Sequence, residues 1–211
     1  MTSSNRGYVA SSGEMVAIEP RPQHRFGTKL VAVERLHNVK ELAPAGPGPW
    51  AGEADEIAWT DGTNYSCLVR RDGEGGHLCG HVGVGGDHPL FGFGLRALLG
   101  LDLVVHGGVK RAGACQACEP ENVPVCRVRD GLDDAWWIGF ECDGPSDVLP
   151  NGSPDSRGGA GTGERIYRDE AYVYAEVVSL ARQLKDVEDS IGAGSQDRGL
   201  LNVRVDLKGW R

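Results

Sequence analysis

The chain has 211 residues, of which 40% are hydrophobic and 25% are charged, and its formal net charge is −8. This composition is typical of a globular protein with enough apolar residues to bury a core. The negative charge argues against a general binder of the nucleic-acid backbone, because such binders present an excess of cations.

No targeting or membrane segment is recognisable in the sequence. The first residues, MTSSNRGYVASSGEM, are small and polar and lack the apolar core of a signal peptide. The most apolar stretch, residues 95–105, contains Arg96 and Asp102 and is too short to cross a bilayer. We therefore expect a cytoplasmic protein that does not bind membranes and whose six cysteines are reduced.

The first half of the chain predicts short strands and turns. Residues 29–36 alternate between apolar and polar side chains, as a strand does, whereas residues 43–52 are rich in Pro and Gly and predict a long loop. Residues 56–71 predict a hairpin, because two β-prone runs flank the dipeptide Asp61-Gly62.

Three further strands are predicted, at residues 77–84, 102–109 and 135–142. The last of them is rich in aromatic and β-branched side chains and is expected at the centre of the sheet. Residues 151–164 are rich in Gly and Ser and predict a loop.

The only strong helix signal covers residues 169–188. Asp169 and Glu170 begin this segment, where carboxylates favour the helix dipole, and Gly192 and Gly194 follow it. Apolar residues recur at spacings of three and four, which places them on one helix face: Val173, Val177, Leu180, Leu184 and Val187.

Together these elements predict an α+β fold, with an antiparallel or mixed sheet and one long C-terminal helix packed on it. We expect an N-terminal arm over residues 1–25, a single α+β domain over 26–191 and a C-terminal tail over 192–211. Alternation at residues 201–207 of the tail allows one last strand.

The cysteines allow a zinc site. Cys115 and Cys118 have the CxxC spacing of zinc ligands, and Cys126 and Cys142 could complete a set of four thiolates. Cys142, however, ends a predicted core strand, where a free cysteine commonly packs as a small apolar residue. We favour that interpretation and predict no metal and no cofactor. Two other residues could serve as alternative ligands: Cys79 and His81.

Three histidines, His81, His88 and His106, lie at predicted strand ends or in loops. Taken singly, each is most simply a hydrogen-bonded loop residue. Together with Glu141 and Asp147 they could form a metal site or an acid/base pair. The sequence does not show whether these side chains converge.

The segment His106-Gly107-Gly108 ends an apolar run, and Lys110 and Arg111 follow it. Glycines leave backbone N–H groups uncovered, so that an anionic ligand can approach the chain closely. The alternative interpretation is a tight turn that binds nothing. Both remain open.

The adjacent residues Trp136 and Trp137 must point to opposite faces of their strand. We expect one ring in the core. The other ring either packs under the long helix or can stack on a planar ligand in a pocket.

Several ordered segments carry a resemblance: GHLCGHVGVGGDHPLFG, VVHGGV, WWIGFECDGPSDVLP and YRDEAYVYAEVVSLARQL. Over about residues 76–187 the chain resembles a family of small proteins of phages, prophages and actinobacterial genomes. That family has the patterns VHGGLTF, WWFGFDCAHxGD and YRDxxYV.

The chain departs from the family pattern at several positions. Glu141 replaces an Asp, Gly144 replaces a His, His81 replaces a Tyr, and Lys110-Arg111 replace a Thr and an aromatic residue. If the family histidine were a metal ligand or a catalytic base, this chain has lost it. The departures therefore favour binding over metal-dependent chemistry.

The resemblance implies an accessory protein in the cytoplasm of an infected or lysogenic bacterium. We predict that it binds and hides a nucleotide-derived signalling molecule without catalysis, as anti-defence sponges of phages do; a homo-oligomer is compatible with this role. The expected ligand-binding residues are His88, His106, Gly107, Gly108, Lys110, Arg111, Trp136, Trp137, Glu141, Asp147, Tyr167 and Arg168.

Two alternatives remain at this point. One is a hydrolase or phosphodiesterase, with or without a metal, that uses His88, His106, Glu141 and Asp147 on a nucleotide-like substrate. The other is a structural or protein-interaction module that has no pocket.

Overall fold

The computed structural model describes residues 21–114, 134–152 and 164–196, with the side chains of 192–196 excepted. Eight strands and two helices lie in these ranges. In chain order they are β1 (Gln23–Phe26), β2 (Lys29–Ala32), β3 (Arg35–His37), β4 (Glu56–Thr60), β5 (Ser66–Arg71), β6 (Leu78–Val84), α1 (Leu95–Leu98), β7 (Arg111–Ala114), β8 (Trp136–Glu141) and α2 (Glu170–Gln196).

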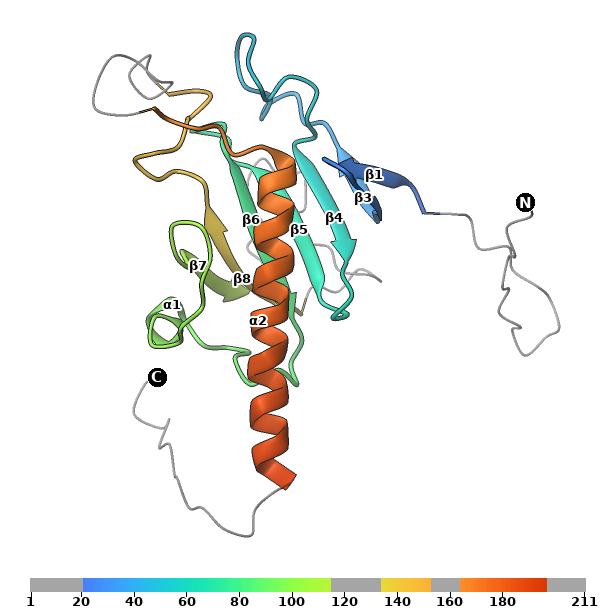
Figure 1. Cartoon of the computed structure of the whole chain (residues 1–211), viewed down its shortest axis with the longest axis vertical. Helices are drawn as coiled ribbons and strands as arrows, with labels where there is room; N and C mark the ends of the chain where they lie inside the picture. Colours follow the sequence, from blue (N-terminus) through green and yellow to red (C-terminus); the bar gives the residue numbers. More distant parts are fainter. Residues whose placement is uncertain (1–20, 115–133, 153–163, 197–211) are drawn as a thin grey trace, which may run out of the picture.

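The strands form two antiparallel sheets. β1 and β2 make a small hairpin, and the other six strands make one sheet in the order β3-β4-β5-β6-β8-β7. The long helix α2 packs along one face of this larger sheet, mainly on β6 and β5 (Figure 1). The predicted α+β class, with one long C-terminal helix on a sheet, is confirmed, and the strand pairs of the sheet are all antiparallel.

The predicted apolar face of α2 forms the centre of the core. Val173, Val177, Leu180 and Leu184 are fully buried, and Val187 is partly buried at the edge of the same cluster. Asp169 caps the helix, because its Oδ1 accepts the backbone N–H of Tyr172 at 2.8 Å.

Gly80 on β6 allows the helix to lie this close to the sheet. A Cβ at this position would lie 2.5 Å from the ring of Phe140 and 2.6 Å from the Val177 side chain. Phe140 and Ile138 therefore point toward α2, and since side chains alternate along a strand, Trp137 and Glu141 point to the other face.

Two predicted strand regions differ in detail from the structure. The hairpin over residues 56–71 forms, but its turn spans residues 61–65, and the residue with positive φ is Asn64 (72°) rather than Gly62. The predicted strand at 29–36 divides into β2 and β3. Between them Val33 donates to Pro22 O and Glu34 donates to Ala58 O, which moves the chain from the small sheet to the large one.

The prediction of a strand at residues 102–109 is wrong. This segment pairs with no strand in the described part of the chain, and it turns at Gly107 and Gly108. Side chains of α2 take the place of a partner strand: Gln183 exchanges two hydrogen bonds with the backbone of Val104, at 2.7 and 2.8 Å. Leu101, Leu103 and Val105 still pack against the core, which accounts for the alternating pattern in the sequence.

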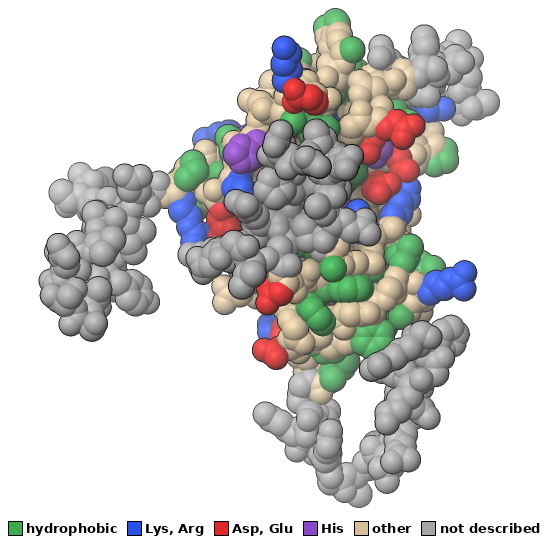
Figure 2. Space-filling view, turned by 180° about the vertical axis from the view of Figure 1, so that it is seen from behind, with side chains coloured by type: hydrophobic (Ala, Val, Ile, Leu, Met, Phe, Trp, Pro, Cys, Tyr) green, Lys and Arg blue, Asp and Glu red, His purple; other side chains and the backbone are tan. Residues whose placement is uncertain are grey.

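The described helices do not include one whose length and apolar character would suit a bilayer crossing. Viewed from behind, acidic and basic side chains are interspersed on the visible surface, and hydrophobic side chains gather in the lower part of the molecule (Figure 2).

Candidate functional site

The structure distributes the sequence-predicted site residues over several places. One group surrounds His106, a second lines a pocket at β7, and the rest are buried in the core or belong to other polar clusters. Among the described residues, the expected ligand-binding residues therefore do not line one common pocket.

His106 is the centre of the first group. Its Nε2 lies 2.6 Å from Asp147 Oδ2 and its Nδ1 lies 2.9 Å from the hydroxyl of Tyr172 on α2. The backbone N–H of His106 donates to Glu176 Oε2 at 2.8 Å. Gly107 and Gly108, with φ of 64° and 80°, turn the chain immediately afterwards, a conformation that favours glycine.

Asp147 connects three segments of the chain. Its side chain is 1% exposed and accepts hydrogen bonds from His106, from Arg168 Nε at 2.9 Å and from the backbone N–H of Gly144 at 2.8 Å. Burial raises the pKa of Asp147, but these three donors together outweigh it and hold the pKa below its usual value. Arg168 also lies over the ring of Tyr172, 4.7 Å from its centroid.

This cluster holds the His106 turn against the start of α2. Both ring nitrogens of His106 already have partners, and the carboxylate of Asp147 is shared among three donors. Such an arrangement fixes two loops and a helix N-terminus in one geometry. It brings together His106, Asp147 and Arg168, which come from the HGG segment, from the loop after β8 and from the YRD segment.

A pocket of about 510 Å³ lies along β7, which forms one edge of the described sheet. This is a normal size for a site that holds a small molecule. Its described lining residues are Leu95, Lys110, Arg111, Ala112, Gly113, Ala114 and Trp136.

The indole of Trp136 is fixed in this pocket. Its Nε1 donates to Phe93 O at 2.9 Å, and its ring lies 6.0 Å from that of Phe91. Lys110 binds the carboxylate of Asp143, and its backbone N–H donates to Gly139 O at 2.9 Å. The pocket is therefore lined by two basic residues and a held aromatic ring. Lys110 is paired with Asp143, and Arg111, which is opposite Gly139 in the register, leaves β7 on the other face from Trp136, which is opposite Ala114.

Two other pockets have a different character. One of about 470 Å³ lies at the start of α2 and is lined by Arg165 and by four carboxylates: Glu53, Glu164, Asp169 and Glu170. Another, of about 480 Å³, lies between Trp59, Tyr174 and Arg182 and also contains Asp61.

Two of the expected ligand-binding residues are buried elsewhere. His88 is 4% exposed; its Nδ1 accepts the N–H of Leu90, and its Nε2 lies 3.0 Å from Leu184 O of α2. Trp137 is 4% exposed on the sheet face opposite α2. The structure thus places His88 under the middle of the helix, with different partners from those of His106.

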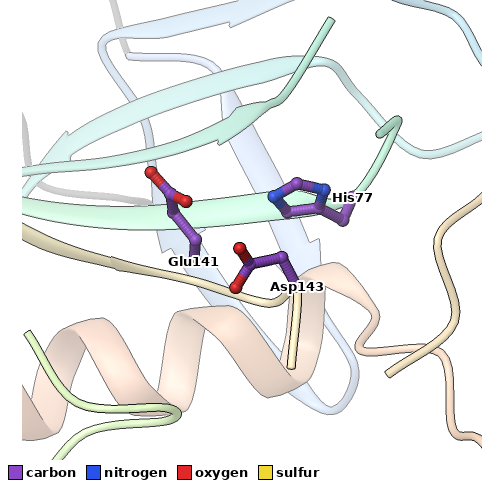
Figure 3. Close-up of side chains that lie close together, drawn as sticks. All are labelled: His77, Glu141 and Asp143. Carbon is purple, nitrogen blue, oxygen red and sulfur yellow. The ribbon is translucent and has the colours of Figure 1, made fainter. Parts of the chain in front are cut away.

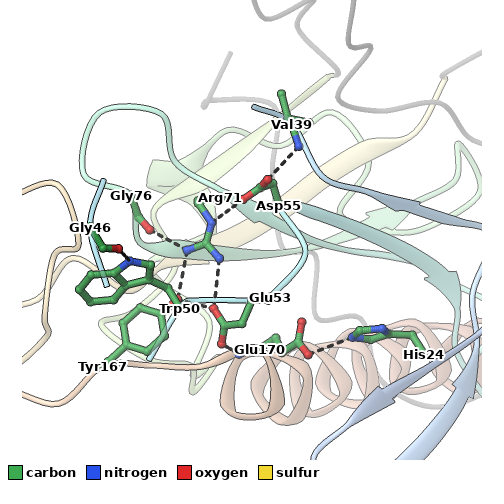
Figure 4. A network of polar contacts seen from close by, with 10 residues as sticks. All are labelled: His24, Val39, Gly46, Trp50, Glu53, Asp55, Arg71, Gly76, Tyr167 and Glu170. Atoms are coloured by element: carbon green, nitrogen blue, oxygen red, sulfur yellow. Dashed lines mark hydrogen bonds and ion pairs between the residues drawn. The ribbon is translucent and has the colours of Figure 1, made fainter. Parts of the chain in front are cut away.

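Tyr167 belongs to a buried ionic network that the sequence reasoning missed (Figure 4). At its centre is Arg71, whose side chain is fully buried and binds Asp55 Oδ1 at 2.7 Å, Glu53 Oε2 at 3.1 Å and the hydroxyl of Tyr167 at 3.1 Å. Burial and the nearby carboxylate of Glu53 raise the pKa of Tyr167, so the phenol remains protonated.

The same network holds the loop before β4 against the start of α2. Glu53 Oε1 accepts the backbone N–H of Glu170, and Glu170 Oε1 lies 3.0 Å from His24 Nε2. Residues of this kind are hard to find from one sequence, because Arg71, Glu53 and Asp55 have no fixed spacing that marks them as partners.

Cys142 is 1% exposed and packs in the core under α2. Burial and the neighbouring Asp147 raise the pKa of its thiol, which keeps it neutral. The other members of the candidate zinc set, Cys115, Cys118 and Cys126, lie outside the described residues. Glu141 lies beside His77 and Asp143 rather than beside His106 (Figure 3).

Comparison of the chain with protein-family models, with curated proteins and with solved structures found no match.

Proposed function

We propose that this protein binds and sequesters a nucleotide-derived small molecule, and that the ligand occupies the pocket along β7. The observation that carries the proposal is the combination of Lys110, Arg111 and Trp136 around one pocket of about 510 Å³. A nucleotide offers the two complementary features, a phosphate for the cations and a flat base for the indole.

The pocket has features of a preformed site. The hydrogen bond from Trp136 Nε1 to Phe93 O fixes the ring, so that little freedom is lost when a base stacks on it. The outer edge of β7 adds main-chain groups that face no other described strand. An anion can pair with Arg111 at the edge of the strand, or with Lys110 in place of Asp143, and a base can stack on the indole of Trp136.

The hydrolase alternative would rest on the His106–Asp147 pair, 2.6 Å apart. A general base needs a ring nitrogen that is able to take a proton from water. The second ring nitrogen of His106 is engaged by Tyr172, and we therefore favour sequestration over catalysis. The setting in a phage or prophage, as an anti-defence sponge in the bacterial cytoplasm, rests on the sequence resemblance.

The proposal is tested by incubating the purified protein with AMP, GMP, ADP-ribose and a cyclic dinucleotide, and measuring the free nucleotide by chromatography before and after heat denaturation. We expect one of these ligands to be depleted and then recovered intact. Recovery of an altered nucleotide would establish an enzyme, and no depletion of any of them would contradict the proposal.

Two variants locate the binding to the pocket. Arg111→Gln and Trp136→Phe should each weaken depletion at least several-fold. The matched control is Arg182→Gln, because Arg182 is a cation that lines a different pocket. Equal depletion by the wild type and both pocket variants would place the ligand elsewhere.

A further inference from the structure

A histidine and two carboxylates lie together at the end of the β6–β8 pair, beside Lys110, which also lines the β7 pocket. In the antiparallel register Cys79 is opposite Glu141, and Cys142 donates its N–H to Leu78 O at 3.1 Å. Continuing this register places His77 directly opposite Asp143. Glu141 is two residues before Asp143, and so all three side chains leave the same face of the sheet, opposite α2.

The side chains converge as the backbone register requires. One ligand atom from each of His77, Glu141 and Asp143 lies within 4.8 Å of the other two (Figure 3). The two carboxylates are half-buried, whereas the side chain of His77 is 9% exposed. The group therefore has a buried end, formed by the imidazole, and an end that solvent reaches.

Besides this convergence, the unpaired ring nitrogens of His77 are a second and independent indication that the group binds a ligand. Neither of its ring nitrogens has a hydrogen-bond partner among the described residues. Buried polar atoms in folded proteins are nearly always paired, and leaving one unpaired costs about 1–3 kcal/mol. A bound cation would satisfy the ring nitrogen that faces the carboxylates.

The surroundings of His77 also fix which nitrogen is available. Nδ1 lies toward the turn before β6, 3.9 Å from Asp72 Oδ2, the ion-pair partner nearest to it. Nε2 lies on the other side of the ring and is the nitrogen left for a metal ion. In Figure 3 the imidazole presents its other nitrogen toward Glu141.

We propose that His77, Glu141 and Asp143 bind a divalent transition-metal ion. One imidazole and two carboxylates suit ions such as Zn²⁺, Mn²⁺ and Co²⁺, and three protein ligands leave a coordination position for water or another ligand. Lys110 binds one oxygen of Asp143, so the metal either takes the other oxygen or displaces the lysine.

The test is a titration of the full chain with Co²⁺, followed by visible absorption. We expect one Co²⁺ per chain, with d–d bands of an oxygen and nitrogen site and without a thiolate charge-transfer band, which separates this site from the cysteines. His77→Ala and Asp143→Asn should each reduce the affinity at least tenfold. Circular dichroism of both variants verifies that they are folded.

His37→Ala is the matched control, because His37 is an exposed histidine on β3. Its Co²⁺ affinity should equal that of the wild type. Three results would overturn the proposal: no Co²⁺ binding by the wild type, a thiolate band in its spectrum, or unchanged affinity in both folded variants. The assay detects the metal directly, and its outcome does not depend on the nucleotide proposal.

Discussion

At the scale of single residues, buried polar side chains rather than exposed ones organise this protein. Arg71 has no exposed side-chain surface and is paired with Glu53 and Asp55, while Asp147 joins His106 and Arg168. Isolated charges in these positions would be strongly destabilising, and so each depends on its partners.

The first prediction concerns Arg71. Arg71→Leu should lower the free energy of unfolding by about 3–5 kcal/mol, because it leaves the carboxylates of Glu53 and Asp55 buried without their cation. Urea unfolding followed by far-UV circular dichroism measures the change. Arg25→Leu, at an exposed position on β1, is the control and should change stability by less than about 0.5 kcal/mol.

The second prediction concerns the pH dependence of stability. The pKa of Asp147 is lower in the folded than in the unfolded chain, so the unfolded state binds a proton more readily. The contribution of this residue is therefore present above its unfolded pKa, about 3.9, and is lost as the pH falls through its folded pKa. Asp147→Asn should be less stable at pH 7 and lose less stability between pH 5 and pH 2.

Chemical denaturation of the wild type and of Asp147→Asn across this pH range measures the difference. Asp102→Asn, at an exposed position, controls for the removal of one charge. Parallel curves for the wild type and Asp147→Asn would contradict the prediction, because they would show that protonation of Asp147 is not linked to folding.

At the scale of elements, the sequence predicted those helices and strands that pack on or pair with other helices and strands. The helix α2 could be predicted because burial on one helix face leaves a periodic pattern in the sequence, and the hairpin of β4 and β5 because two β-prone runs flank a turn dipeptide. Residues 102–109 have the same two-residue period but satisfy their backbone through Gln183 and Glu176 of α2. A pattern of side chains does not reveal what pairs with the backbone, and this is why the strand prediction failed.

The third prediction tests the packing of α2. Leu180→Ala should cost about 2–5 kcal/mol of unfolding free energy, because Leu180 is fully buried between the helix and the sheet. Ile191→Ala on the same helix is the control, since Ile191 is 55% exposed, and it should cost much less. A loss under about 0.5 kcal/mol for Leu180→Ala would contradict the observed helix–sheet contact.

At the scale of the whole molecule, the sequence predicted the class of fold, whereas its set of ligand-binding residues stays a prediction. It brought attention to Lys110, Arg111 and Trp136, which share a pocket, and to His106, Asp147 and Arg168, which share a cluster. The sequence could not show that the β7 pocket and the His106 cluster are separate, because their positions depend on the order of the strands in the sheet. The pairing of β7 with β8 and of His77 with Asp143 depends on long-range register, which residue types alone do not encode.

The central claim, that a nucleotide binds in the β7 pocket, is tested most directly by the indole N–H resonance of Trp136 in a ¹⁵N-labelled sample, assigned with Trp136→Phe. During titration with each of the four nucleotides used in the depletion assay, we predict that the bound one shifts this resonance to saturation. The chemical shift of the Trp50 indole N–H should not change, because Trp50 packs against Tyr167 and does not line the β7 pocket. An unmoved Trp136 resonance with every nucleotide, or a shift confined to other tryptophans, would contradict the account.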